Sequence, residues 1–78
     1  MSEYTVDARK LLCPLPVIRT QNAAKELADG DILKVICTDR GALSDIPAWC
    51  RVHGHRVIGT EEGEKELTIT IQLIKSAG

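Results

Sequence analysis

The sequence predicts an α/β (α+β) two-layer sandwich of order βαβαββ, in which two helices cover one face of a mixed four-stranded sheet. Two strand-like segments alternate with two segments whose apolar residues recur at helical spacing, which indicates a βαβα order. Two further strand-like segments joined by a short acidic turn indicate a terminal hairpin. A chain of 78 residues is too short to divide, so residues 1–78 are expected to form a single domain.

The first half of the chain predicts a strand, a helix and a second strand. Residues 4–8 are β-branched and alternating, as in a strand. A helix is expected from Pro16 to about Asp29, because the first turn tolerates proline and Gly30 can adopt the left-handed conformation that ends a helix. Residues 32–38 are almost continuously apolar and predict an interior strand, parallel to the first. The predicted buried stripe of the helix consists of Val17, Ala24, Leu27 and Ala28.

The second half predicts a helix followed by two antiparallel strands. Ser44 or Asp45 is expected to cap the start of the helix, and Gly54 is expected to end it. The strands are predicted at residues 55–60 and 67–74. The predicted buried stripe of this helix is Ile46, Trp49, Cys50 and His53. On the last strand, the packed face is predicted to carry Leu67, Ile69, Ile71 and Leu73.

The composition is that of a folded protein without a membrane span or a nucleic-acid site of its own. Hydrophobic residues make up 44% of the chain and charged residues 27%, close to the globular average. No apolar run approaches the roughly 20 residues of a membrane span, and residues 1–4 do not resemble a secretory signal, so a cytoplasmic protein is expected. A net charge of −1 and only two aromatic residues, Tyr4 and Trp49, disfavour nucleic-acid binding.

The three cysteines are predicted to be free thiols, because their number is odd and their spacing fits neither a metal site nor a disulfide framework. Cys37 ends an apolar strand and Cys50 lies on an apolar helix stripe, so both are predicted to be small buried core residues. A zinc site that combines them with His53 and His55 is disfavoured by the spacing. Neither a metal nor a bound cofactor is expected.

The most informative segment is residues 11–16 (LLCPLP), where the first strand gives way to the first helix. Pro14 disfavours the α region for Cys13, so the thiol is expected at or just before the helix N-terminus. The positive end of a helix favours a thiolate, which would make Cys13 nucleophilic. The alternative, that Cys13 is an ordinary capping or half-buried cysteine, stays open on the residues alone. Three basic residues nearby in the sequence are candidates for thiolate support or partner docking: Arg9, Lys10 and Arg19.

The chain resembles the TusA/SirA-like family of small sulfur-carrier proteins over nearly its whole length. The resemblance rests on Asp7, Leu11, Cys13-Pro14-Leu15-Pro16, Asp45-Ile46-Pro47-Ala48-Trp49-Cys50 and Gly54-His55. It implies the βαβαββ fold and a sulfurtransferase role in which Cys13 accepts sulfane sulfur as a persulfide, supported by Pro14 and Pro16 of the motif. The implied partners are a cysteine desulfurase or rhodanese-type donor and a downstream acceptor protein. The implied pathways are tRNA 2-thiouridine synthesis, dissimilatory sulfur oxidation and molybdenum-cofactor maturation, and the residues do not choose among them.

Two positions depart from the family pattern. Lys10 stands where the family often has glycine, which suggests a different approach of the chain to the strand-to-helix junction. Asp39-Arg40 stands where an Asp-Pro pair is common. Both changes leave the Cys-Pro-x-Pro motif intact, so they bear on the choice of partner more than on the sulfur chemistry.

Other interpretations remain at this point. A non-enzymatic regulatory or protein-interaction module would use the Cys-Pro-Leu-Pro turn as a structural element, and a redox sensor would pair Cys13 with a second thiol. Asp7 and Asp45 are expected to cap or brace turns rather than transfer protons, because neither has an identifiable partner carboxylate or histidine.

Overall fold

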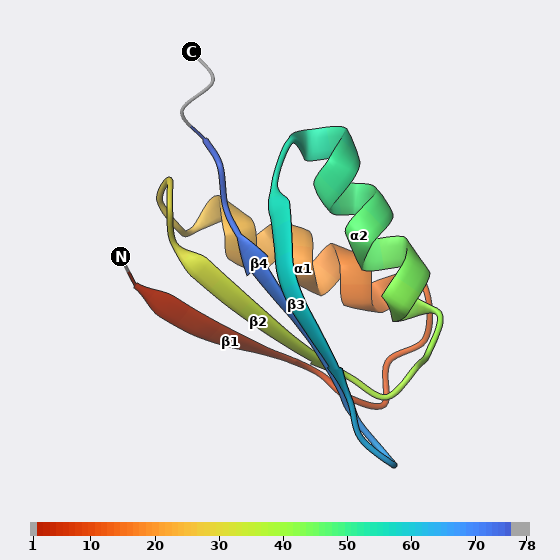
Figure 1. The fold of residues 1–78 in the computed structure, drawn as a ribbon. Coiled ribbons are helices and arrows are strands. Elements are labelled where there is room, and N and C mark those ends of the chain that lie inside the picture. Colours follow the sequence, from red (N-terminus) through yellow and green to blue (C-terminus); the bar gives the residue numbers. More distant parts are fainter. Residues whose placement is uncertain (1, 76–78) are drawn as a thin grey trace.

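The structure, a computed structural model, describes residues 2–75 and has the element order βαβαββ that the sequence predicts (Figure 1). No helix among these residues has the length and apolar character that crossing a membrane requires. The elements are β1 (Glu3–Ala8), α1 (Leu15–Lys25), β2 (Ile32–Cys37), α2 (Ala42–His53), β3 (Arg56–Glu62) and β4 (Leu67–Gln72).

The four strands form one mixed sheet in the order β1-β2-β4-β3. Strands β1 and β2 pair in parallel, with Val6 opposite Val35. Strand β4 inserts between β2 and β3 and runs antiparallel to both, and a register shift between Val57 and Gly59 marks a bulge in β3. The predicted parallel pair and the predicted antiparallel hairpin are both confirmed.

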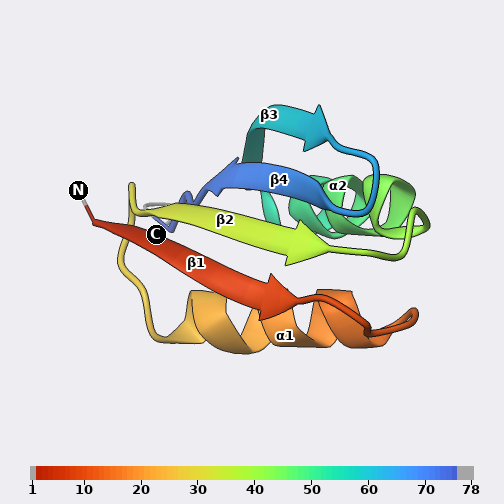
Figure 2. The same cartoon turned by 90° about the horizontal axis from the view of Figure 1, so that it is seen from below.

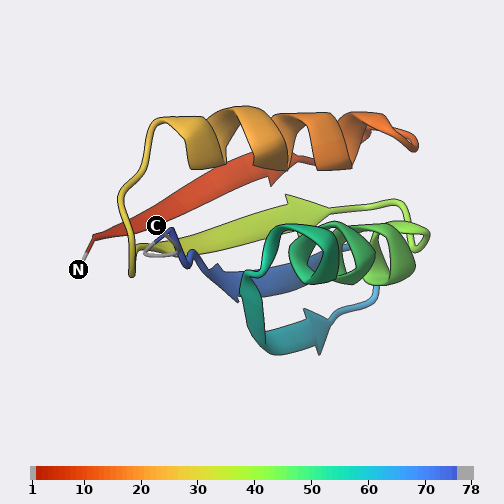
Figure 3. The same cartoon turned by 90° about the horizontal axis from the view of Figure 1, so that it is seen from above.

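Both helices lie on one face of the sheet and contact each other, so the molecule has two layers. Helix α1 packs on β1 and β2, whereas α2 packs on β3 and β4. Figure 2 shows the face of the sheet that no helix covers, and Figure 3 shows the opposite face with both helices over it. Because β1 and β2 are parallel and each leads into a helix, the loops that begin α1 and α2 meet at the carboxyl end of this strand pair.

The core lies between the helices and the sheet, and strict alternation along the strands builds it. Leu33, Val35 and Cys37 of β2 are fully buried, and their neighbours in the sequence are half-buried. The predicted alternation of the last strand is confirmed, since its apolar face is buried and its polar face is half-exposed: Leu67, Ile69, Ile71 and Leu73 lie inside.

Helix α1 differs from its prediction in length and in its buried face. It ends at Lys25, about one turn before the expected end, and Gly30 takes its left-handed conformation (φ 86°) in the following loop instead of at the helix terminus. The buried residues are Pro16, Thr20 and Ala24. Thr20 is tolerated inside because its hydroxyl donates a hydrogen bond to the Pro16 carbonyl at 2.8 Å. Of the predicted stripe, Ala24 is buried, Val17 and Leu27 are half-buried, and Ala28 is exposed.

Helix α2 begins earlier than predicted and ends as predicted. Gly41 is its N-cap, and neither Ser44 nor Asp45 caps it. Gly54 ends it in the left-handed conformation (φ 76°), as expected. Within the predicted stripe Ile46 and Cys50 are buried, Trp49 is half-buried, and His53 is exposed. Because the helix starts at Ala42, Pro47 falls inside it rather than in the first turn.

Candidate functional site

Cys13 lies in the loop between β1 and α1, directly before the helix. The Cys13–Pro14 peptide bond is cis, Pro14 is the N-cap of α1, and Pro16 lies in the first turn. A turn closed by a 2.8 Å hydrogen bond from the Leu15 amide to the Leu12 carbonyl presents the cysteine between two apolar side chains. Leu12 is 72% exposed and Leu15 is 47% exposed, so both stand out from the surface beside the thiol.

The three cysteines divide into one exposed thiol and two buried ones. Cys13 is exposed, whereas the residues Cys37 and Cys50 are only 0% and 1% exposed, which confirms their predicted place in the core. Burial raises the pKa of both core thiols to about 11. A buried thiol is out of reach of other molecules, so Cys13 is the cysteine whose thiol is open to them.

The loop that carries Cys13 is fastened to the loop that begins α2. The Asp39 carboxylate accepts a hydrogen bond from the Cys13 amide through Oδ2 at 3.2 Å, and one from the Gly41 amide through Oδ1 at 3.1 Å. On the β1 side, the Lys10 amide donates to Thr38 Oγ1 at 2.8 Å. These contacts hold the two carboxyl-terminal loops of the parallel strands together and fix the backbone around the thiol.

The electrostatic surroundings of Cys13 correct an expectation from the sequence. The thiol lies beside Asp45, which comes from the first turn of α2. The hydrogen bond with the Asp45 carboxylate raises the pKa of the Cys13 thiol, followed by desolvation and by the negative charges of Asp45 and Asp39. The pKa of the Cys13 thiol is therefore raised, whereas the helix N-terminus was expected to favour the thiolate.

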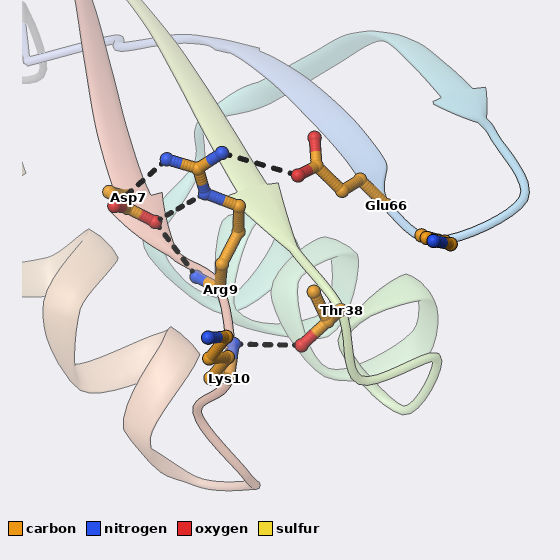
Figure 4. A pocket seen from close by; sticks show the side chains of 6 residues that line it. Asp7, Arg9, Lys10, Thr38 and Glu66 are labelled. Carbon is orange, nitrogen blue, oxygen red and sulfur yellow. Dashed lines mark hydrogen bonds and ion pairs between the residues drawn. The ribbon is translucent and has the colours of Figure 1, made fainter.

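Of the three basic residues predicted to support the thiolate, Arg9 is bound to two carboxylates (Figure 4). Arg9 forms ion pairs with Asp7 at 3.0 Å and with Glu66 at 3.2 Å, bridging the end of β1 to the residue before β4. Arg19 Nη1 donates to the Asp7 carbonyl at 3.4 Å. Lys10 lines a hollow of about 550 Å³ together with Arg9 and Glu66. Asp7 also accepts a hydrogen bond from the Arg9 amide at 3.0 Å, which is the turn-bracing role predicted for it.

Lys10, which stands where the family often has glycine, adopts a backbone conformation that favours glycine. Lys10 has a φ of 64°, the one positive φ at a non-glycine residue in the described part of the chain. Glycine adopts this region without cost, whereas other residues are strained there. The backbone thus adopts at Lys10 a conformation that glycine would favour.

Sequence reasoning missed the neighbourhood of Asp39 and Asp45 with Cys13. One signal was available, because parallel strands β1 and β2 bring their carboxyl ends to the same edge of the sheet and Asp39 follows β2 closely. The contact of Asp45 with the thiol depends on the position of α2, which the sequence placed too far along the chain.

The fold and the site together define a small two-layer α/β protein that exposes one thiol at the edge of its sheet and buries its other cysteines. Residues 4–73 match the family model described as Sulfurtransferase TusA. The chain is 44% identical over 64 residues to the putative sulfur carrier protein YrkI of Bacillus subtilis (strain 168), covering 81% of this chain and 85% of that protein. It is 45% identical over 60 residues to the sulfur carrier protein TusA of Pseudomonas entomophila (strain L48), covering 77% of this chain and 75% of the relative.

A solved structure shares the fold. The crystal structure of the SirA-like protein from Desulfitobacterium hafniense superimposes with a TM-score of 0.76 at 24% identity, covering 92% of this chain and 99% of that one. With the family model and these relatives, the chain belongs to the TusA family of sulfur carriers and sulfurtransferases. The resemblance noted from the Cys-Pro-x-Pro motif is confirmed.

Proposed function

We propose that this protein accepts a sulfane sulfur on Cys13 as a persulfide and relays it to an acceptor protein. The observation that carries the proposal is the exposure of Cys13 in a protein whose other cysteines are buried. Membership of the TusA family supports it, because the family model is described as a sulfurtransferase and the relatives are named sulfur carriers. Pro14 and Pro16 support the site by fixing the backbone on either side of the helix start.

The transfer is an exchange of one S–S bond for another. The Cys13 thiolate attacks the terminal sulfur of a donor persulfide, a bond forms between Cys13 Sγ and that sulfur, and the donor S–S bond breaks. The bonding electrons leave with the donor cysteine, which takes up a proton. The second transfer repeats this with an acceptor nucleophile attacking and Cys13 leaving. Sulfur moves without a net oxidant, so the chain needs no redox cofactor of its own.

Two macromolecular partners follow from this chemistry. The donor is a cysteine desulfurase or a rhodanese-type protein, and the acceptor is a protein of tRNA 2-thiouridine synthesis, dissimilatory sulfur oxidation or molybdenum-cofactor maturation. The exposed Leu12 and Leu15 provide an apolar rim against which a partner can exclude water during transfer. Exchange between thiols requires reduced cysteines, so we place the protein in the cytoplasm.

Intact-mass measurement tests the proposal. Wild type, Cys13→Ser, Cys37→Ser and Cys50→Ser are incubated with a cysteine desulfurase and cysteine, or with a rhodanese and thiosulfate, and then examined with and without reductant. The expected result is a reducible gain of about 32 Da that only Cys13→Ser loses. Retention of the gain in a folded Cys13→Ser protein, or no gain with either donor in folded wild type, contradicts the proposal and favours an interaction module.

A further inference from the structure

A charged hollow of about 550 Å³ lies at the carboxyl end of β1 and β2, where the β1–α1 loop meets the β3–β4 hairpin (Figure 4). Its volume falls in the range of roughly 300–1,000 Å³ in which proteins bind ligands. Three cations of the lining outnumber its two carboxylates, so the hollow carries an excess of positive charge. The lining consists of Asp7, Arg9, Lys10, Thr38, Lys65 and Glu66.

One of these cations and both carboxylates are committed to one another. Arg9 pairs with Asp7 at 3.0 Å and with Glu66 at 3.2 Å, which joins the end of β1 to the residue before β4. Figure 4 shows the Arg9 guanidinium between the two carboxylates. A compact polyanion placed against this bridge would be repelled by Asp7 and Glu66, so the hollow accepts negative charge at its other two cations.

Those two cations, Lys10 and Lys65, have no partner within residues 2–75. Neither ammonium forms an ion pair or a hydrogen bond with a residue that the structure describes. Lys10 is held by its backbone instead, because its amide donates to Thr38 Oγ1 at 2.8 Å. The Thr38 hydroxyl keeps its own hydrogen, so it can donate to a ligand in the same hollow.

Lys10 holds its side chain in place at a conformational cost. Its φ of 64° lies in the left-handed region, which glycine adopts freely and which strains a residue with a Cβ atom. Such strain persists mainly where a residue serves a function. No contact of the Lys10 ammonium inside the described chain offsets the strain, so the ammonium points to a group outside the protein.

We propose that this hollow is the docking site for an acidic segment of the protein with which Cys13 exchanges sulfur, and that carboxylates of that segment bind Lys10 and Lys65 separately. The two lysines are the sequence neighbours of Arg9 and Glu66, so they flank that ion pair. An extended segment with spaced carboxylates reaches both ammonium groups without placing its charge on the bridge. The proposal deepens the proposed function and rests on it for the identity of the partner.

The hollow is coupled to the cysteine loop through the backbone. Lys10 lies three residues before Cys13 in the same loop. Thr38 directly precedes Asp39, whose carboxylate accepts a hydrogen bond from the Cys13 amide at 3.2 Å. A partner seated in the hollow is therefore held at the edge of the sheet that carries the thiol. Charges at such a rim mainly raise the rate of encounter and select the partner.

The first test is an NMR titration of the ¹⁵N-labelled protein with a capped hexaglutamate peptide. Amide shifts are expected to concentrate at Lys10, Thr38 and Lys65, and the dissociation constant is expected to rise about 3-fold or more in Lys10→Gln and in Lys65→Gln. The matched control is Lys25→Gln, which removes the same charge in the last turn of α1 and should leave the constant nearly unchanged. Shifts spread over the whole surface, or an equal loss of affinity in Lys25→Gln, overturn the proposal.

A second titration replaces the peptide with inorganic tripolyphosphate. This compact polyanion cannot reach both lysines without meeting Asp7 and Glu66, so it is expected to bind the hollow more weakly than hexaglutamate. Tighter binding of tripolyphosphate, with shifts at the same amides, would assign the hollow to a small polyanion and overturn the proposal.

A third test separates the ammonium of Lys10 from its backbone. Lys10→Gly relieves the strained φ, so it should unfold in urea no more easily than wild type, yet it should lose about 3-fold in affinity for hexaglutamate. Lys10→Arg keeps the charge and should stay within about 2-fold of wild type. Wild-type affinity in Lys10→Gly overturns the proposal. None of these tests uses a sulfur donor, so a failure here is distinct from a failure of sulfur loading.

Discussion

The Asp39 carboxylate accepts a hydrogen bond from the backbone amide of Cys13 at 3.2 Å across a separation of 26 residues. Its other oxygen binds the Gly41 amide, so one side chain joins the loops that begin α1 and α2. The backbone of the reactive cysteine is therefore held by the second βα unit as well as by its own.

Replacing Asp39 should loosen this junction. Asp39→Ala removes the acceptor for two backbone amides, so we expect unfolding in urea to show a loss of about 1 kcal/mol and amide exchange at Cys13 to accelerate. Asp39→Asn, which keeps one acceptor oxygen, should show a smaller loss. The control is Glu64→Ala on the hairpin. Unchanged amide exchange at Cys13 in Asp39→Ala would show that the contact does not restrain the loop.

The left-handed conformation of Lys10 leads to a pair of opposite expectations. Lys10→Gly should be neutral or stabilising by up to about 1 kcal/mol, because relief of the strained φ of 64° offsets the extra freedom of glycine in the unfolded chain. Lys10→Val should destabilise by roughly 1–2 kcal/mol, since β-branched residues are poorly accommodated there. Urea unfolding measures both changes. Lys34→Val, the same substitution within strand β2, is the control, and an equal loss at both positions would contradict the conformational argument.

The Asp7–Arg9 ion pair predicts a loss of stability in acid. Hydrogen bonds from Arg9 lower the pKa of Asp7 from 3.8 to about 2. A carboxylate with a lowered pKa stabilises the fold above its unfolded pKa, so this contribution is present above pH 4 and is lost as the pH falls toward 2. Arg9→Gln should be less stable than wild type at pH 6 and should lose less stability between pH 4 and 2. Urea unfolding at each pH measures these changes, and Arg51→Gln is the control. If wild type and Arg9→Gln lose the same stability between pH 4 and 2, the ion pair does not contribute to the stability of the fold.

The lowered pKa of His55 predicts that stability also depends on pH closer to neutrality. Burial, followed by the charges of His53 and Lys75, lowers the pKa of His55, and its Nδ1 accepts a hydrogen bond from the Ile74 amide at 3.0 Å. The folded protein therefore binds this proton less readily than the unfolded chain, so stability should fall as the pH drops below about 6.5 and level off below the lowered pKa. A protonated Nδ1 can no longer accept the Ile74 amide.

His55→Asn separates the hydrogen bond from the titration, because the asparagine Oδ1 can take the place of Nδ1 as acceptor. The difference in unfolding free energy between pH 7.5 and 5.5 should shrink in this variant. His53→Gln, which removes a more exposed imidazole on the same aromatic cluster, should retain part of it. A slope in His55→Asn as steep as that of the wild type would assign the dependence to other groups.

The strands could be predicted because the alternation of apolar and polar residues with a period of two identifies both a strand and its buried face. Leu67 and Ile69 alternate with polar threonines on β4, and that pattern gave both the strand and its packed face. The buried face of helix α1 was harder to predict, because it includes the polar residue Thr20. The Thr20 hydroxyl donates a hydrogen bond to the Pro16 carbonyl of the same helix, which allows this side chain to be buried. The start of α2 was predicted too late in the chain. Asp39, which precedes the helix, accepts a hydrogen bond from the amide of the N-cap residue Gly41, and neither Ser44 nor Asp45 caps the helix.

The site was predicted only as far as local sequence determines it. Pro14 placed Cys13 next to the helix start, and apolar neighbours placed Cys37 and Cys50 in the core. The charges around the thiol depend on contacts between segments far apart in the chain. Arg9 is close in sequence but bound to Asp7 and Glu66, whereas Asp45 is distant in sequence and raises the pKa of the thiol.

The central position of β4 bears on the order of events at the ribosome. Strand β4 follows β3 in the chain, yet it separates β2 from β3 and pairs with both. A nascent chain that stops before residues 67–72 lacks the strand that joins its two halves, so α2 has no joined sheet on which to dock and Asp45 is not yet held beside Cys13. A chain that lacks residues 67–72 would therefore carry Cys13 without a joined sheet to position α2 beside it.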